Sequence, residues 1–132
     1  MSFRVYLDSS ALVKLVREEA ESSALRDHLQ SVAHAHSCAL VKVEVVRTAR
    51  VHGEWVAGHA RELVESLELV ALDDDLLSAA AALDPLPLRS LDAIHIAAAQ
   101  TLGSALDELV TYDRRMIDAA TDRGLVVSHP GL

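Results

Sequence analysis

The sequence predicts an α/β fold in which a central, mostly parallel β-sheet is flanked by helices. Short apolar segments of strand type alternate with segments of helical periodicity along the whole chain, and this pattern is typical of a parallel sheet covered on both faces. No linker, internal repeat or change of composition interrupts the alternation, and the length of 132 residues suits one domain. We therefore expect a single domain over residues 1–132.

The first half of the chain is expected to contain two strands and four helices. A short apolar strand ends at Asp8, and Ser9 or Ser10 is a suitable cap for the helix that follows. The long apolar segment before Gly53 contains valines that also suit a strand, but its length favours a helix. The expected elements are strand 3–7, helix 11–16, helix 21–30, a weak strand 32–37, helix 40–52 and helix 54–66.

The second half is expected to contain three strands and three helices. Three consecutive aspartates, 73–75, open a helix, because acidic side chains are favoured at the positive end of the helix dipole. The Pro-rich stretch 84–87 ends that helix, and Ser90 is expected to cap the next one. The expected elements are strand 67–72, a helix from 73, helix 91–102, strand 109–112, a helix through Met116 that ends at Gly124, and strand 125–127.

The composition indicates a globular protein with an aliphatic core. Hydrophobic residues make up 51% of the chain and aromatic residues only 3%, so Leu, Val, Ala and Ile must fill the interior. The single cysteine, Cys38, excludes an internal disulfide and fits a reducing compartment. No apolar stretch approaches the ~20 residues that span a bilayer, and Asp8 interrupts the first apolar segment before it reaches signal-peptide length. We therefore expect a cytoplasmic protein.

The charge balance limits the kinds of partner. There are 12 Lys and Arg residues against 20 Asp and Glu residues, which gives a net charge of −8. Such a charge disfavours broad electrostatic binding to nucleic acid. It suits a basic protein partner instead.

Four acidic residues occupy positions that a parallel sheet can bring together: Asp8, Glu44, Asp92 and Asp113. Asp8 and Asp113 each follow an expected strand, and open α/β sheets form their sites outside the carboxyl ends of the strands. The two acids therefore share a crevice if their strands are neighbours. Acids that converge repel one another unless a cation lies between them, and carboxylates are the ligands that Mg²⁺ prefers. The pattern favours a metal-dependent enzyme that cleaves phosphodiester bonds.

Each of these acids also has a purely structural interpretation. Asp8 and Asp113 can cap the helices that follow them, and Asp92 suits the positive end of its own helix. Glu44 lies on a mostly apolar helix, where an acid must be paired or act as a ligand. Arg47, three residues further on, can supply that pair.

Two other reactive side chains are given structural interpretations. His95 shares a helix face with Asp92 and is interpreted as a packing residue rather than a metal ligand. Cys38 has no evident base partner and is interpreted as a small buried residue. The sequence contains no Gly-rich phosphate loop and no Gly-x-Ser-x-Gly elbow.

Four segments resemble motifs of the PIN-domain family, and most closely those of its VapC-type bacterial toxins. They are YLDSSALVKLVREE at residues 6–19, VEVVR around Glu44, LDAIHIAAA at 91–99 and VTYDRRM at 110–116. Each motif alone is loose, but together they keep the order and spacing of the family over nearly the whole chain.

The resemblance implies a PIN-like sandwich and a Mg²⁺- or Mn²⁺-dependent endoribonuclease, the toxin of a type II toxin–antitoxin pair. The four acids of the family match Asp8, Glu44, Asp92 and Asp113, and Thr111 matches the supporting hydroxyl of the Thr-x-Asp motif. No expected acid is missing. The resemblance also implies homodimers, and a cognate antitoxin that covers the acidic pocket with a basic segment.

On this hypothesis, Asp8 and Asp92 chiefly hold a first metal ion, and Asp113 and Glu44 complete its shell or hold a second ion. Attack by water would leave a 5′-phosphate and a 3′-hydroxyl. The candidates for phosphate contact are Arg4, Lys14, Arg17, Arg47, Arg89, Arg114 and Arg115.

Two alternative functions remain. One is another Mg²⁺-dependent phosphoryl-transfer enzyme on a similar sheet. However, a haloacid-dehalogenase-like phosphatase needs a second acid where Ser10 stands, and the strand-end lysine of a receiver domain is not evident. The other is a non-catalytic module whose acids bind a basic peptide.

Overall fold

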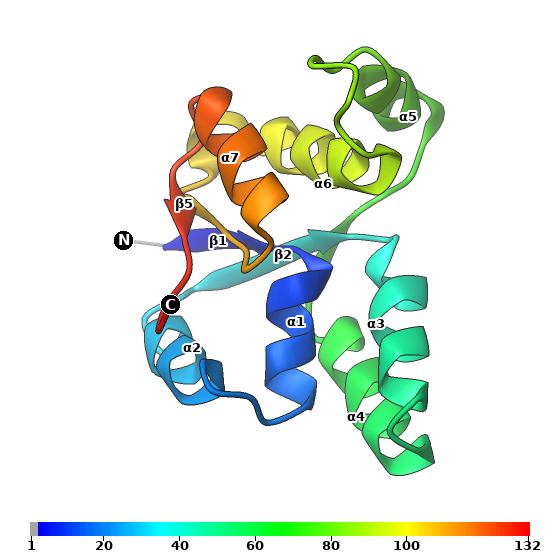
Figure 1. Cartoon of the computed structure of the whole chain (residues 1–132), viewed down its shortest axis with the longest axis vertical. Coiled ribbons are helices and arrows are strands. Elements are labelled where there is room, and N and C mark those ends of the chain that lie inside the picture. The colour runs from blue at the N-terminus through cyan, green and yellow to red at the C-terminus, as the bar shows by residue number, and fades with distance from the viewer. Residues whose placement is uncertain (1–2) are drawn as a thin grey trace.

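A computed structural model describes residues 3–132. A five-stranded sheet lies between two layers of helices, with α1 to α4 on one face and α5 to α7 on the other (Figure 1). The strands are β1 Arg4–Leu7, β2 His34–Cys38, β3 Glu68–Val70, β4 Glu108–Val110 and β5 Val127–Ser128. The helices are α1 Ser9–Val16, α2 Ser22–Leu29, α3 Val41–Arg50, α4 Glu54–Glu65, α5 Asp74–Ala81, α6 Ser90–Thr101 and α7 Arg114–Asp122, and the short 3-10 helix η1 is Gly103–Ala105.

The order of the strands creates a switch point between β1 and β4. The order is β3-β2-β1-β4-β5, and every neighbouring pair is parallel. The chain first moves outward through β2 and β3, and then returns to the other side of β1, where Leu7 lies opposite Val110. In open α/β sheets ligands bind outside the carboxyl ends of the strands at such a point. The predicted α/β class is confirmed, and so is the expectation that the strands before Asp8 and Asp113 are neighbours.

Alternation of side chains along the strands divides the interior into two cores. In β1, Val5 and Leu7 pack against the layer of α1, α3 and α4, whereas Tyr6 packs against α6 together with Leu109 of β4. All four side chains are buried. Because helices cover both faces, these strands consist of apolar runs rather than alternating polar and apolar residues.

At the start of two helices the expected serine caps are wrong, and at the first of them the alternative cap, Asp8, is confirmed. Asp8 caps α1 by accepting a hydrogen bond from a backbone N–H of the first turn, and Ser9 and Ser10 lie inside the helix. Similarly, Ser90 is the first residue of α6, and Arg89 occupies the cap position without a side-chain hydrogen bond. The acidic side chain at the end of β1 reaches the first helical turn directly, so no serine is needed there.

Other expected boundaries are confirmed or shifted by a few residues. Asp73 caps α5, as the three acids predict. Gly53, with φ of 110°, separates α3 from α4 in a backbone conformation that other residues rarely adopt. The last strand, expected at 125–127, is β5 Val127–Ser128. Within residues 3–132, no helix combines the length and apolar character needed to cross a membrane.

Candidate active site

The carboxylate of Asp8 lies at the switch point, directly after β1, and is only 3% exposed. Its Oδ1 accepts hydrogen bonds from the Ser10 hydroxyl (2.6 Å) and the Ala11 backbone N–H (3.1 Å), and its Oδ2 accepts one from the Thr111 hydroxyl (2.5 Å). Burial raises the pKa of Asp8, and the donors of Ser10 and Thr111 oppose that rise. Donors on both oxygens therefore fix the direction of this side chain.

Thr111 joins the ends of β1 and β4. It is fully buried, and its hydroxyl donates to Asp8 while accepting a hydrogen bond from the backbone N–H of Asp113 (3.2 Å). The resemblance pairs Thr111 with Asp113, but its hydroxyl proton goes to Asp8. Asp113 itself caps α7, because its Oδ1 accepts the N–H of Arg115 at 2.9 Å. The capping interpretations of Asp8 and Asp113 are thus confirmed, and both caps lie just beyond the carboxyl ends of neighbouring strands.

Asp92 lies in the first turn of α6, within the electrostatic field of the other acids. Burial raises the pKa of Asp92, the charges of Asp113 and Asp8 add to that rise, and Arg89 opposes it. The Oδ2 atom of Asp92 is buried and has no hydrogen-bond partner within residues 3–132. A buried carboxylate oxygen without a donor is costly, and a cation would satisfy it.

Glu44, on α3, is paired with His95 and not with Arg47. Glu44 Oε1 lies 2.8 Å from His95 Nε2, and in the described part of the chain no ion pair joins Glu44 to Arg47. His95 is 2% exposed, and its Nδ1 lies 2.8 Å from the Tyr6 hydroxyl. Because a carboxylate only accepts hydrogen bonds, Nε2 carries a proton. Burial opposes a charge on His95, but Cys38 and Glu44 prevail and raise the pKa of the imidazole to about 10.

Sequence reasoning missed three features around this site. His95 is a buried packing residue, as interpreted, but it also holds Glu44. Its i, i+3 spacing from Asp92 places it on the same face of α6 as that acid, but no local signal pairs it with Glu44. Cys38 is buried as expected, but the view that it lacks a base partner was wrong, because its Sγ lies 3.8 Å from His95 Nδ1. Ser10 was considered only as a cap, although a serine two residues after an aspartate can bond back to it.

The donor atoms fit a hard divalent cation. The four acids offer only oxygen ligands, as Mg²⁺ and Mn²⁺ prefer, and both ring nitrogens of His95 already face Glu44 and Tyr6. Among residues 3–132, no three His, Cys, Asp or Glu side chains stand close enough to enclose an ion by themselves. An ion held by these acids would therefore need water in part of its coordination shell, and Mg²⁺ commonly retains water.

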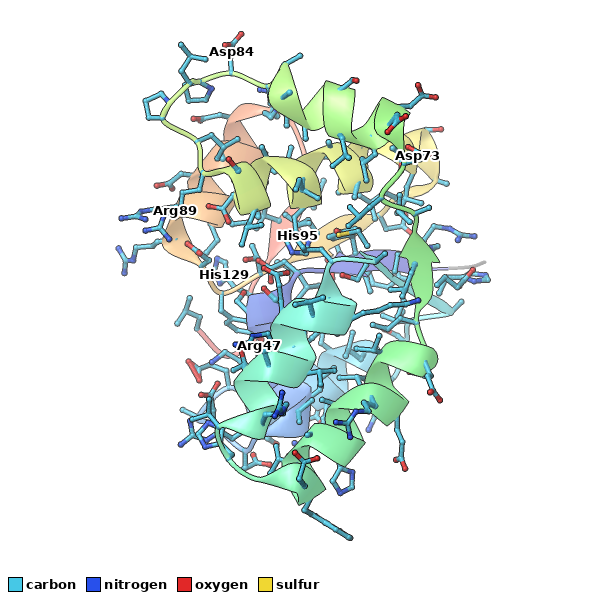
Figure 2. The ribbon with its side chains drawn as sticks, turned by 90° about the vertical axis from the view of Figure 1, so that its right-hand side faces the viewer. Arg47, Asp73, Asp84, Arg89, His95 and His129 are labelled. Carbon is cyan, nitrogen blue, oxygen red and sulfur yellow. The ribbon has the colours of Figure 1, made fainter. Side chains whose placement is uncertain are left out.

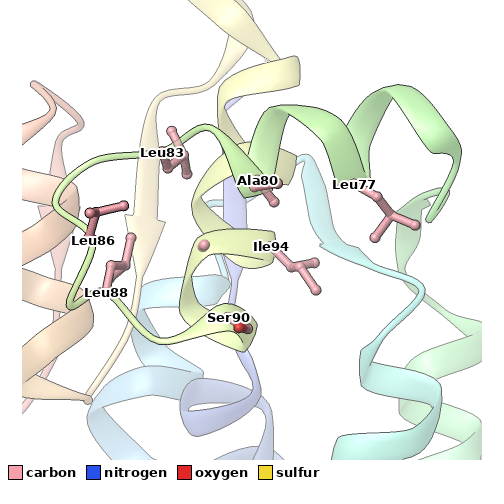
Figure 3. A pocket seen from close by; sticks show the side chains of 9 residues that line it. Leu77, Ala80, Leu83, Leu86, Leu88, Ser90 and Ile94 are labelled. Atoms are coloured by element: carbon pink, nitrogen blue, oxygen red, sulfur yellow. The ribbon is translucent and has the colours of Figure 1, made fainter.

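Two arginines that are near Glu44 and Asp92 in sequence belong to different helical layers. Arg89 precedes α6 in the upper layer, and Arg47 belongs to α3 in the lower layer, with His95 between the layers (Figure 2). A separate groove of about 290 Å³ lies between α5 and the start of α6 and contains none of the four acids (Figure 3). Most side chains in its walls are apolar, and they include Leu77 and Leu86, which are 44% and 87% exposed.

Comparison with known proteins identifies the family. The PIN domain description matches residues 5–122. Ribonuclease VapC46 of Mycobacterium tuberculosis is 45% identical over 126 residues, which cover 96% of this chain and 97% of that protein. Ribonuclease VapC35 of the same species is 42% identical over 131 residues, with the same coverage. The fold also resembles the crystal structure of M. tuberculosis VapC20, described as a sarcin-ricin loop cleaving toxin, with a TM-score of 0.76 and 16% identity over 96% of this chain and 99% of that one. The chain belongs to the PIN-domain family.

Proposed function

We propose that this protein is a divalent-metal-dependent endoribonuclease and the toxin of a type II toxin–antitoxin pair. The observation that carries the proposal is the buried, unpartnered Oδ2 of Asp92 in the field of Asp8 and Asp113. It lies beside the switch point of the sheet, where ligands of α/β proteins bind. Two relatives named ribonucleases, 45% and 42% identical over nearly their whole lengths, support RNA as the substrate.

Asp8 and Asp92 would chiefly hold a first Mg²⁺ or Mn²⁺ ion, and Asp113 and Glu44 would complete the shell or hold a second ion. A bound divalent cation supplies Lewis acidity, which lowers the pKa of water and neutralises charge on phosphate oxygens. The use of water as the nucleophile predicts products with a 5′-phosphate and a 3′-hydroxyl. This chemistry does not need the ribose 2′-hydroxyl, so RNA must be selected by binding.

The protein's own contribution is preorganisation of the carboxylates. Ser10 and Thr111 hold the two oxygens of Asp8 through donors at 2.6 and 2.5 Å. His95 holds Oε1 of Glu44 and leaves Oε2 without a protein hydrogen bond in the described residues. These contacts fix the ligands before metal or substrate arrives, so little reorganisation is needed during the reaction.

An antitoxin with a basic segment is the proposed protein partner. We call the four candidate acids the acid centre: Asp8, Glu44, Asp92 and Asp113. These acids and the net charge of −8 both favour a cationic ligand. The groove of Figure 3 would receive the apolar side of the same partner. Exposed acids, Asp74, Asp75 and Asp84, lie close in sequence to its leucines and suit a basic segment. Homodimer formation, implied by the family, remains a prediction.

Cleavage of RNA by the purified protein tests the proposed function. The wild type should cut RNA only when Mg²⁺ or Mn²⁺ is present, and sequencing of the new ends should find 5′-phosphates at preferred sites. The Asp8→Asn and Asp92→Asn variants should lose at least about 100-fold in rate, whereas Asp27→Asn, at an exposed position on α2, should keep the wild-type rate. Equal cleavage by Asp8→Asn and wild type would mean that the activity lies elsewhere.

A further inference from the structure

Two surface grooves meet the acid centre from opposite helical layers. The first, of about 670 Å³, lies between α1 and α3 and has Glu44 and Arg47 in its walls. The second, of about 360 Å³, lies between the start of α6 and α7. Its walls contain Arg89 and Arg115 together with the acids Asp92, Asp118 and Asp122. We call these grooves the α1/α3 groove and the α6/α7 groove. Each contains one acid of the centre and at least one arginine, and Figure 2 shows Arg47 and Arg89 in the two different layers.

The arginines of these walls form no ion pair with a carboxylate. Within residues 3–132, no ion pair joins Arg47, Arg89 or Arg115 to an Asp or Glu side chain, whereas Arg26 and Arg61, elsewhere on the surface, are each paired with a glutamate. Other basic side chains of the described residues also lack such a pair, but they lie outside the walls of both grooves: Arg4, Arg17, Lys42, Arg114 and Arg123. The chain has 20 acidic and only 12 basic residues, so carboxylates are in excess. Three arginines without a carboxylate partner, all beside the acid centre, are therefore available to an external anion.

The other cation of the α1/α3 groove is different. Lys14 lies 3.1 Å from Glu19 and 3.4 Å from Glu21, and its ammonium lies 4.8 Å from the centroid of the Tyr112 ring. Its charge is thus already compensated. Within the described residues, Arg47 is the basic side chain of that groove without a carboxylate partner. Its substitution therefore tests phosphate binding without breaking an ion pair.

We propose, building on the ribonuclease function above, that one RNA strand crosses the acid centre and occupies both grooves. Arg47 binds a phosphate on one side of the scissile bond, and Arg89 with Arg115 binds phosphates on the other side. RNA carries one phosphate per nucleotide, and guanidinium groups bind phosphate oxygens through paired hydrogen bonds. In a protein of net charge −8 these arginines supply local attraction for phosphate inside the two grooves. The substrate must then extend on both sides of the cut.

Salt dependence of binding tests the phosphate contacts without any cleavage. A fluorescein-labelled single-stranded RNA of about 16 nucleotides is titrated by anisotropy, in EDTA, with Asp8→Asn protein as the common background. Each phosphate contact contributes about 0.7 to the slope of log K against log salt for single strands. We expect Arg47→Gln to reduce the slope by about 0.7 and the Arg89→Gln/Arg115→Gln pair by about 1.4, additively. Arg26→Gln and Arg61→Gln are the matched controls and should leave the slope unchanged.

Shortened substrates test which side each groove serves. An RNA whose cleavage site has been mapped is trimmed to a single nucleotide on the 5′ or the 3′ side of the cut. Loss of a charge-assisted contact should lower kcat/KM of the wild type about tenfold or more for either trimmed RNA. Trimming on one side of the cut should leave kcat/KM of Arg47→Gln unchanged. Trimming on the opposite side should leave kcat/KM of the Arg89→Gln/Arg115→Gln pair unchanged.

The results separate this inference from the proposed function. Three results would each overturn the two-groove path even if RNA is cut. The first is that the arginine variants show the same salt dependence of binding as the background protein, and the second is that trimming leaves kcat/KM of the wild type unchanged. The third is that Arg47→Gln and the Arg89→Gln/Arg115→Gln pair become insensitive to trimming on the same side of the cut. Absence of metal-dependent cleavage with the expected slopes would refute the ribonuclease proposal and keep the RNA-binding path. All three arginines are exposed, so equal urea midpoints should show that folding is unaffected by their substitution.

Discussion

Replacement of Thr111 by valine should destabilise the fold and the candidate site together. Valine has nearly the same shape as threonine but lacks the hydroxyl group. Because Thr111 is fully buried, no water molecule can replace the lost hydroxyl. Asp8 Oδ2 then loses its donor at 2.5 Å, and the backbone N–H of Asp113 loses its acceptor at 3.2 Å. The substitution therefore removes polar contacts and leaves the apolar packing nearly unchanged.

The expected cost follows from these two contacts. A hydrogen bond to a charged group contributes about 1.5–3 kcal/mol, and a neutral one about 0.5–1.5 kcal/mol, so we expect a loss of roughly 2–4.5 kcal/mol at neutral pH. At about 4 °C per kcal/mol for a domain of this size, Tm should fall by roughly 8–18 °C. Thr111→Ser keeps the hydroxyl and removes one buried methyl group, which costs only about 1 kcal/mol.

Urea unfolding of the metal-free protein measures both variants. The pH dependence identifies the mechanism. The Thr111 donor lowers the pKa of Asp8 against the effect of burial, so its contribution is present while Asp8 is ionised and is lost as pH falls and the carboxyl group is protonated. The difference between Thr111→Val and wild type should thus shrink at acidic pH. Equal costs for valine and serine, or a cost independent of pH, would refute the reasoning.

Three further predictions concern His95 and Asp92. Glutamine can present a donor near the position of His95 Nε2, whereas asparagine can present one only near that of Nδ1. Calorimetry should therefore find that His95→Gln retains most of the Mn²⁺ affinity and that His95→Asn loses about tenfold or more. Equal losses in the two variants would mean that the hydrogen bond from His95 to Glu44 does not support metal binding. Because the pKa of His95 is raised to about 10, the free energy of unfolding of the wild type should decrease as pH rises from 6.5 through about 10. An equally steep decrease with pH in His95→Gln would contradict this. Since burial and neighbouring acids raise the pKa of Asp92, ionisation of Asp92 opposes folding above its raised pKa, so Asp92→Asn should be more stable than wild type at neutral pH without metal. Mn²⁺ at 100 times its Kd should stabilise wild type by about 2.7 kcal/mol and Asp92→Asn much less, as thermal unfolding can show.

The order of the elements could be predicted because strands and helices have different apolar periods. Their ends could not be predicted as well. β5 begins at Val127 rather than at residue 125, because pairing with Leu109 of β4 decides where the ladder starts. Asp8 replaces the expected serine cap because a side chain at the end of β1 reaches the N–H of Ala11.

The acids at strand ends were accessible to sequence reasoning for a topological reason. The carboxyl ends of neighbouring parallel strands lie at one edge of the sheet, so Asp8 and Asp113 could be placed together before the structure was known. The partner of Glu44 could not be predicted in this way. His95 lies 51 residues further along the chain, and only the packing of α6 over the sheet decides that it meets α3. Arg47 is near Glu44 in sequence, and this local proximity favoured the wrong pair.

Anomalous diffraction from crystals of the protein soaked in Mn²⁺ can show whether these carboxylates bind a metal ion, because it locates the metal independently of activity. The account predicts a Mn²⁺ peak within coordination distance, about 2.0–2.4 Å, of oxygens of Asp8 or Asp92, with water and Asp113 or Glu44 in the remaining shell. The Asp92→Asn protein should lose that peak. A fully soaked crystal with no peak at the carboxyl ends of β1 and β4, or with the ion bound at another part of the surface, would contradict the account.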